Sequence, residues 1–210
     1  VHAETSTGVC QPMEGLGELC RKYDCLLLLD TVTSLGGVPL FLDEWKVDLA
    51  YSCSQKGLSC PPGLGPFTIN ERAEEKLHKR KTNVPNWYLD VSLLNKYWGS
   101  DRVYHHTAPV NMNFGIREAL RLLVDEGLES SWNRHETNAK YLWNGLEALG
   151  LKLHVPEDLR LATLTTVCIP PGVDGKSFSL HLLNEYGVEI GGGLGDLAGK
   201  VWRIGLMGYN

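Results

Sequence analysis

The run Cys25-Leu-Leu-Leu-Leu-Asp30 constrains the fold most, because it follows a helix pattern with no loop in between. In residues 13–23 the apolar side chains fall on one helical stripe, formed by Leu16, Leu19 and Cys20. A continuous apolar run this short, entered directly from a helix, is typical of a parallel strand buried on both faces. The sequence therefore predicts an α/β sheet with right-handed crossovers.

The remaining pattern predicts two regions. Two further strands are expected over residues 47–53 and 65–70, and a helix over 110–126. A long helix over 128–149 is expected to turn these side chains inward: Trp132, Ala139, Leu142, Leu146 and Leu149. A small α+β region then follows, with strands at 151–155, 164–170, 188–191 and 201–206 and a helix at 176–186. We expect residues 1–126 to belong to a large domain and residues 127–210 to a smaller C-terminal domain.

Composition argues against several classes of protein. The 20 Lys and Arg against 25 Asp and Glu leave a net charge of −5, which is unsuited to a nucleic-acid binder. No apolar run reaches about 18 residues, so no membrane-spanning helix is expected. The 6 cysteines show no C-x-x-C spacing, and we expect them to be reduced and mostly buried in an intracellular protein.

Both ends of the sequence are unlike those of a complete protein. There is no initiator Met or signal peptide, and residues 1–8 resemble the end of a strand that enters a loop. The apolar strand expected at 201–206 is not followed by a closing helix. We therefore expect a fragment whose targeting signals lie outside the given sequence.

Asp30 and Lys56 are the first candidates for chemistry. Ligands of open α/β sheets bind outside the carboxyl ends of the strands, where Asp30 ends one strand and Lys56 follows the next. Each residue also has an ordinary explanation, as a turn carboxylate and a solvated surface lysine. Together at one edge they would place an acid beside an amine able to form a Schiff base.

Arg203 lies inside the apolar strand Val201-Trp-Arg-Ile-Gly-Leu206. Because a guanidinium buried alone is very costly, it either pairs with a carboxylate or binds an anionic ligand, and both alternatives stay open.

Other motifs carry no site. The pattern G-x-G-x-x-A over residues 193–198 is followed by a strand pattern rather than a helix, which excludes a dinucleotide site. His105 and His106 are expected to point apart and have no third ligand, so we predict no metal site. Cys53 and Cys60 flank Lys56 and are expected to be small packing residues rather than nucleophiles.

Four motifs occur in a fixed order along the whole chain. They are Asp30 before Thr-Val-Thr-Ser-Leu-Gly-Gly37, Ser54-Gln-Lys-Gly57 before Pro61-Pro-Gly63, Tyr104-His-His-Thr107, and Gly192-Gly-Leu-Gly195 before Trp202-Arg-Ile-Gly205. Together they resemble the alanine–glyoxylate/serine–pyruvate aminotransferases, which are pyridoxal-phosphate enzymes of fold type I. The resemblance implies about half of such an enzyme: the later part of the large sheet domain and most of a small α+β C-terminal domain.

The resemblance also implies roles for single residues. Lys56 matches the lysine that forms the internal aldimine with pyridoxal 5'-phosphate, and Asp30 matches the acid paired with the pyridine nitrogen. Val32 matches the residue beneath the ring and Gln55 a phosphate contact. Thr5 matches a hydroxyl next to the cofactor, where the family more often has Ser.

Further matches concern the substrate and a second subunit. Arg203 matches the clamp for the substrate carboxylate. Tyr104 and Thr107 match residues that reach the phosphate of a neighbouring subunit's cofactor, which implies a homodimer with composite sites. The implied reaction is transamination between alanine or serine and glyoxylate or pyruvate, in a peroxisome or mitochondrion. Thr31 stands where relatives often carry Ser or Ala, and Cys53 where they carry Gly, so the preferred donor stays open.

Three alternatives remain. A cysteine desulfurase shares the fold and cofactor, but its lysine usually follows a His, whereas Lys56 follows Gln55. A phosphonate transaminase differs in what the anion clamp holds. A folded fragment without catalytic activity is the third alternative.

Overall fold

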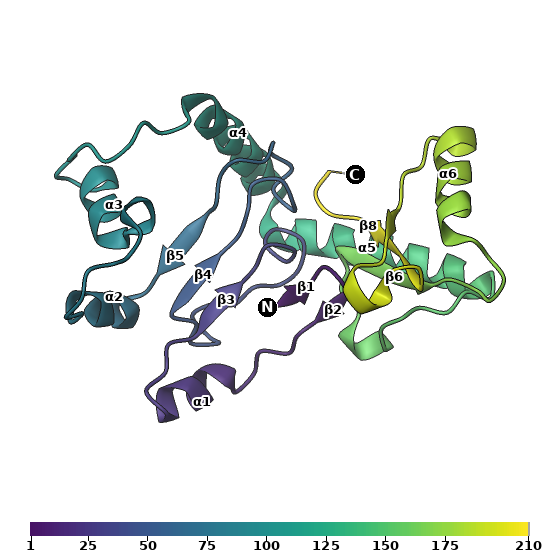
Figure 1. The fold of residues 1–210 in the computed structure, drawn as a ribbon, viewed down its shortest axis with the longest axis horizontal. Helices are drawn as coiled ribbons and strands as arrows, with labels where there is room; N and C mark the ends of the chain where they lie inside the picture. Colours follow the sequence, from purple (N-terminus) through teal and green to yellow (C-terminus); the bar gives the residue numbers. More distant parts are fainter. Residues whose placement is uncertain (210) are drawn as a thin grey trace.

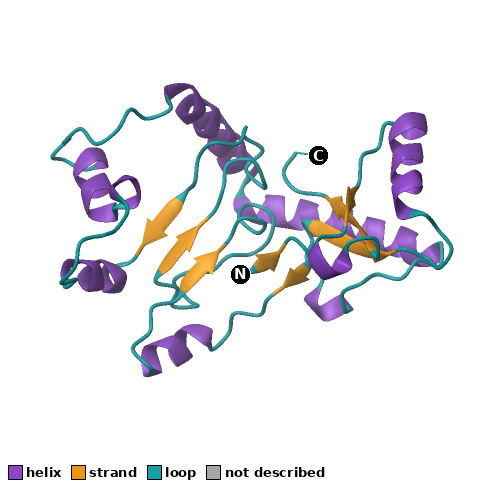
Figure 2. Cartoon of the chain, in the orientation of Figure 1, coloured by secondary structure: helices purple, strands orange, loops and turns teal. Residues whose placement is uncertain are grey.

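Two three-stranded sheets, a short two-stranded sheet formed by β1 and β2, and one long helix organise residues 1–209, the part of the chain that this computed structural model describes (Figure 1). The N-terminal half contains β1 (Ala3–Glu4), β2 (Val9–Cys10), α1 (Leu16–Lys22), β3 (Leu28–Asp30), β4 (Leu49–Tyr51), β5 (Phe67–Ile69), α2 (Glu71–His78), η1 (Trp87–Leu89), α3 (Val91–Trp98) and α4 (Val110–Glu126). The C-terminal half contains α5 (Leu128–Ala148), η2 (Glu157–Leu159), β6 (Leu164–Cys168), α6 (Gly175–Tyr186), β7 (Gly191–Gly192), η3 (Gly195–Leu197) and β8 (Val201–Gly205). Helix α5 extends from the end of α4 toward the part of the molecule that contains β6, β7 and β8 (Figure 2).

The first large sheet has the order β3-β4-β5. Strands β3 and β4 are parallel, with Asp30 opposite Tyr51, whereas β5 runs antiparallel to β4. The predicted parallel pair is confirmed, but burial of β3 on both faces is wrong. Leu29 is 2% exposed and Leu28 is 55% exposed, because successive side chains point to opposite faces.

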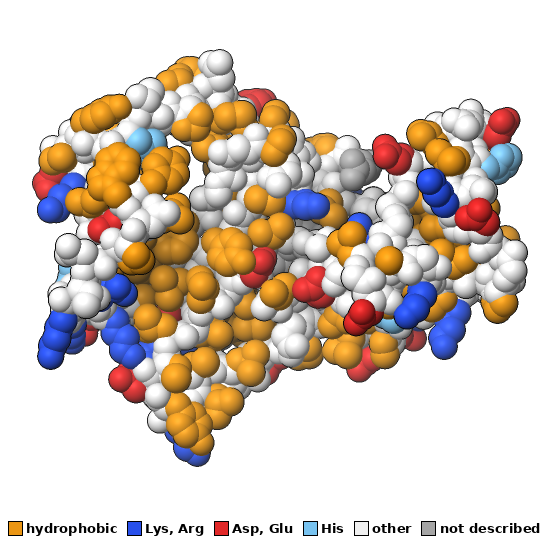
Figure 3. Space-filling view, in the orientation of Figure 1, with side chains coloured by type: hydrophobic (Ala, Val, Ile, Leu, Met, Phe, Trp, Pro, Cys, Tyr) orange, Lys and Arg blue, Asp and Glu red, His pale blue; other side chains and the backbone are white. Residues whose placement is uncertain are grey.

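One face of this sheet is therefore open and apolar. It carries Leu28, Tyr51 and Phe67, all exposed, and Figure 3 shows hydrophobic side chains gathered over these strands. Asp30 lies two positions after Leu28 and so shares this face.

The amino end of the parallel strands is fixed by a buried carboxylate. Asp48 precedes β4 and is 1% exposed. It accepts hydrogen bonds from the Leu27 N–H (2.8 Å), the Asn70 amide (3.1 Å) and the Arg72 guanidinium (2.8 Å). Burial opposes its charge, but these donors outweigh burial, so the pKa of Asp48 is below its ordinary value. These hydrogen bonds lie at the amino end of β3 and β4, so they leave the carboxyl end of the two strands free for other contacts.

The second sheet has the antiparallel order β6-β8-β7. Strand β8 is central and pairs over its full length with β6. The strand expected over 151–155 is reduced to a single bridge between Leu153 and Val167, and the one expected over 188–191 is displaced to β7.

Helix α4 matches its prediction, because Pro109 precedes its first residue and Gly127, with φ of 87°, ends it. Helices α2 and α3 were not predicted. Each begins at a capping side chain: Asn70 accepts the Ala73 N–H, and Asp90 accepts the Ser92 N–H.

The residues that helix α5 buries differ in part from those expected. Ala139 is fully buried as predicted, but Leu149 is 79% exposed and His135 is 1% exposed. The buried cluster around Ala139 includes residues from both sides of position 126: Ala3, Val38, Leu161, Ala162 and Leu164. The domain boundary at 126 stays a prediction.

Two general features complete the fold. All 6 cysteines are free, but of these only Cys60 is buried and Cys25 is exposed, so the expectation of mostly buried thiols is wrong. Within residues 1–209 no helix is long and apolar enough to cross a membrane.

Candidate active site

Asp30 lies half-buried at the carboxyl edge of the first sheet, where β3 ends. Its Oδ1 accepts the Val32 N–H at 2.8 Å, and its Oδ2 accepts the hydroxyl of Tyr51 at 2.6 Å. Both donors are uncharged, so the carboxylate is oriented without an opposing charge. Sequence reasoning missed Tyr51, because only the register of β3 against β4 brings it to Asp30.

The loop after β4 carries Lys56 to the same edge. The buried Ser54 shapes this loop, since its hydroxyl donates to the Pro61 carbonyl (2.7 Å) and accepts the Leu64 N–H (3.3 Å). Gly57 is required by close packing, because a Cβ there would lie 2.2 Å from the Leu35 carbonyl oxygen. The loop of Lys56 therefore packs directly on the segment that follows Asp30.

Lys56 is half-buried, and its amine has no hydrogen bond or ion pair with any residue in the described part of the chain. Its neighbour Gln55 is exposed. An amine without a counter-ion, at the same sheet edge as the Asp30 carboxylate, is available to react with a bound molecule.

The segment after Asp30 is held by the other half of the molecule. Thr163 donates its hydroxyl to the Thr33 carbonyl, and Ser131 of α5 donates to the Gly36 carbonyl, both at 2.7 Å. Val32 lies half-buried at the start of this anchored segment.

Arg203 of β8 is paired with backbone carbonyls. Its Nε donates to the Gly192 carbonyl (2.7 Å) and its Nη1 to the Thr5 carbonyl (3.1 Å). Between residues 1 and 209 it forms no ion pair with a carboxylate, so the ion-pair alternative is not what the structure shows. The two carbonyls leave N–H groups at the Nη1 and Nη2 end of the guanidinium for an anion.

The carboxylate of Glu4, the residue before Thr5, already accepts two hydrogen bonds within the chain. Glu4 accepts the Ser6 N–H (2.8 Å) and the Ser6 hydroxyl (2.6 Å). These hydrogen bonds, led by that of the hydroxyl, hold the pKa of Glu4 below its ordinary value. Among the described residues, Glu4 forms no ion pair with Arg203.

Tyr104 and Thr107 lie elsewhere, on the segment between α3 and α4. Tyr104 is 71% exposed, and its hydroxyl is 2.8 Å from that of Thr107. Figure 1 shows this segment following the outside of the molecule. Among the described residues, neither side chain forms a hydrogen bond with Asp30, Lys56 or Arg203, so the two make a separate polar pair.

Aromatic stacking holds this segment. The rings of His105 and Trp87 stack at 4.0 Å, and the Nδ1 atoms of His105 and His106 lie 2.9 Å apart. The expectation that the two histidines point apart is wrong, because each ring uses its neighbour as a hydrogen-bond partner.

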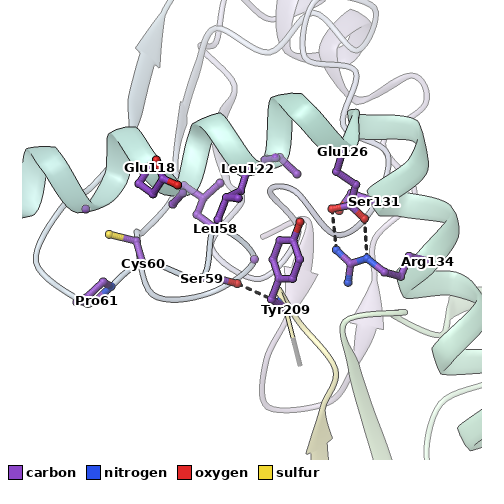
Figure 4. Close-up of a pocket in the computed structure, with 14 residues that line it drawn as sticks. Leu58, Ser59, Cys60, Pro61, Glu118, Leu122, Glu126, Ser131, Arg134 and Tyr209 are labelled. Atoms are coloured by element: carbon purple, nitrogen blue, oxygen red, sulfur yellow. Dashed lines mark hydrogen bonds and ion pairs between the residues drawn. The ribbon is translucent and has the colours of Figure 1, made fainter.

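A cavity of about 220 Å³ lies beneath the Lys56 loop, between it and α4 (Figure 4). Leu58, Cys60 and Leu122 line it, and Tyr209 and Arg134 lie at one end. Lys56, Asp30 and Arg203 do not line this cavity, so it is separate from the candidate site.

Comparison with known proteins shows the family of the chain. A profile of the aminotransferase class-V family matches residues 1–209. The chain belongs to the aminotransferase class-V family. An alanine–glyoxylate aminotransferase of Callithrix jacchus is 49% identical over 213 residues, covering 100% of this chain and 51% of that protein.

Two solved structures show the same class-V fold. The alanine–glyoxylate aminotransferase of Nostoc sp. is 67% identical with a TM-score of 0.97, covering 100% of this chain and 55% of that one. The ureidoglycine–glyoxylate aminotransferase of Bacillus subtilis is 42% identical with a TM-score of 0.95, covering 99% of this chain and 54% of that one. The predicted fold, part of a fold type I aminotransferase, is confirmed. The chain spans about half the length of the curated relatives it matches.

Proposed function

We propose that the complete protein is a pyridoxal-phosphate-dependent aminotransferase that exchanges an amino group between a small amino acid, alanine or serine, and a 2-oxo acid. One observation carries the proposal. In a chain of the class-V family, the carboxylate of Asp30 and the amine of Lys56, which has no counter-ion, lie at the same sheet edge. The hydrogen bonds that orient Arg203 come only from backbone carbonyls.

The residues present fit pyridoxal 5'-phosphate. Asp30 accepts hydrogen bonds from a backbone N–H and a hydroxyl, and a carboxylate oriented in this way suits a protonated ring nitrogen. The amine of Lys56 suits the aldehyde, and Gln55 suits the phosphate. Val32 and Thr5 would complete the surroundings of the ring.

The chain's own groups divide the work. When bound, the cofactor supplies an aldehyde that joins to amines and a ring that draws electrons from the substrate's α-carbon. Asp30 holds the proton on the ring nitrogen, because an opposite charge favours the protonated form. Lys56 would act as the base, its Nζ taking the proton from the α-carbon.

Arg203 would bind the substrate carboxylate. Because the Gly192 and Thr5 carbonyls fix one side of the guanidinium, the opposite N–H groups present a planar fork. Holding the carboxylate in this way also orients the α-carbon toward the base.

The relatives' names favour glyoxylate as the acceptor. One solved relative is named for alanine and glyoxylate, the other for ureidoglycine and glyoxylate, so the donor differs and the acceptor is shared. We infer glyoxylate as the acceptor, with pyruvate as the alternative. The compartment, a peroxisome or mitochondrion by resemblance, stays a prediction.

The separate polar pair supports a homodimer with shared sites. Tyr104 and Thr107 are exposed and hydrogen-bonded to one another, ready to contact a group outside their own subunit. Exposed aromatic side chains accompany them, including Trp87 at 57% and Trp98 at 64%. A second copy of the chain would cover these rings and receive the two hydroxyls at its cofactor phosphate.

Absorbance measurements test the proposed function. The complete protein should turn yellow with pyridoxal phosphate, bleach when L-alanine is added and recover its colour with glyoxylate. D-alanine is the control and should leave the colour unchanged. Sulfide released from cysteine would indicate a desulfurase instead, and bleaching by an aminophosphonate alone a phosphonate transaminase. A protein that never binds the cofactor would contradict the proposal.

A further inference from the structure

Tyr51 is the strongest unassigned group at the candidate site. It ends β4 directly opposite Asp30 of β3, and paired residues of neighbouring strands point to the same face. Its hydroxyl donates to Asp30 Oδ2 at 2.6 Å, a length typical of an O–H···O⁻ bond to a charged acceptor.

The backbone of Tyr51 is also fixed. Its carbonyl accepts both the N–H of Thr31 (2.9 Å) and the hydroxyl of Thr31 (2.8 Å). Thr31 is buried, so the residue that follows Asp30 locks the strand end that carries Tyr51.

The bond from Tyr51 persists over a wide pH range. The hydrogen bond to Asp30 is the main cause that raises the pKa of Tyr51 above its ordinary value. Tyr51 therefore stays protonated at neutral pH and remains a donor to Asp30.

We propose that Tyr51 is the positioning residue of Asp30: its hydroxyl holds in one orientation the carboxylate that pairs with the cofactor's ring nitrogen. This inference rests on the proposed function. The carboxylate has lone pairs left for the ring nitrogen while it accepts from Tyr51 and Val32.

A double-mutant cycle in the complete protein tests this role. Tyr51→Phe should slow the half-reaction with L-alanine by roughly 10-fold to 100-fold, the effect of removing a hydrogen bond to a charged group. In an Asp30→Asn background the same change should cost no more than about 3-fold, since the two residues act as a unit. Tyr141→Phe is the matched control, because Tyr141 is 77% exposed on α5, and it should leave the rate unchanged.

Cofactor binding gives a second readout that is independent of turnover. Spectral titration should show weaker binding of pyridoxal phosphate by Tyr51→Phe, but unchanged binding of the 1-deaza analogue, in which C–H replaces the ring nitrogen. Equal losses with both cofactors, or equal losses in the parent and the Asp30→Asn variant, would make Tyr51 a structural residue and overturn the inference. If the parent protein transaminates normally and Tyr51→Phe matches it, this inference alone fails. If the parent binds no cofactor, the proposed function fails and the inference falls with it.

Discussion

At the scale of single residues, Arg203 is held without being neutralised. Backbone carbonyls of Gly192 and Thr5 accept from its Nε and Nη1, and in the described chain no carboxylate competes for the rest of the guanidinium. Gly191 lies next to the guanidinium, since a Cβ there would be in van der Waals contact with Nη2 at 3.5 Å. The side chain is thus preorganised for an anion.

Arg203→Lys should therefore raise KM for both the amino acid and the 2-oxo acid. Lys keeps the charge but loses the planar fork and its two carbonyl contacts. We expect a loss of roughly 2–4 kcal/mol in kcat/KM, while the yellow colour of the bound cofactor persists. Arg121→Lys, on the exposed side of α4, is the control and should behave as the parent. A colourless Arg203→Lys protein with unchanged KM values would show that Arg203 is structural.

Sequence reasoning reached part of the site at this scale. Asp30, Lys56 and Arg203 stood out because a charged group next to an apolar strand needs a reason. Tyr51 gave no such signal, since a tyrosine in a strand is ordinary and its role depends on the strand register.

At the scale of elements, α5 is joined to the chain after β8 through a buried imidazole. The Nε2 of His135 accepts the Gly208 N–H at 2.9 Å, and its Nδ1 lies 2.7 Å from the Ser131 carbonyl. This geometry requires neutral His135 with its proton on Nδ1. Burial is the main cause that lowers the pKa of His135 below its ordinary value.

The free energy of unfolding should depend on this lowered pKa. The folded state binds the proton less readily than the unfolded chain, so the contribution is intact above the ordinary pKa of 6.5. This contribution of His135 to the free energy of unfolding is lost as the pH falls through the lowered pKa that His135 has in the folded state. Urea unfolding at about pH 8 and about pH 5.5 should show a smaller pH effect for His135→Gln than for the parent. An identical pH effect in both proteins would mean that His135 does not titrate on unfolding.

Elements with strong local signals were the ones predicted correctly. Helix α4 is bounded by Pro109 and Gly127, whose effects on the backbone are local. Helices α2 and α3 were missed although Asn70 and Asp90 cap them, because each is only 8 residues long. The 151–155 strand failed because pairing with β6, which is a tertiary contact, stops at a single bridge.

At the scale of the whole molecule, two features point outward. The open face of the first sheet carries Asp30 and Tyr51, and the segment between α3 and α4 presents Tyr104 and Thr107. The matched relatives are about twice as long as this chain. The composite site can therefore be tested only in the complete, assembled protein.

Mixing inactive variants tests the composite site. One variant carries Lys56→Ala, and the other carries Tyr104→Phe with Thr107→Val. In a mixed dimer, the intact Lys56 of one subunit meets the intact Tyr104 and Thr107 of the other, so one site is restored. If subunits assort at random, activity should reach about one quarter of the unmutated level, because half of the dimers are mixed and each has one site. Each variant unfolded and reassembled alone is the control. Mixtures no more active than either variant would place every contributing residue within one chain.

Trapping the cofactor tests the central claim most directly. Borohydride reduction of the complete, cofactor-loaded protein fixes the cofactor to the lysine that holds it, and peptide mass analysis identifies that lysine. We predict the pyridoxyl group on Lys56, because it follows β4 at the sheet edge where Asp30 ends β3, and its amine has no partner among the described residues. A pyridoxyl group on Lys46 or Lys200, with Lys56 unmodified, would contradict the account.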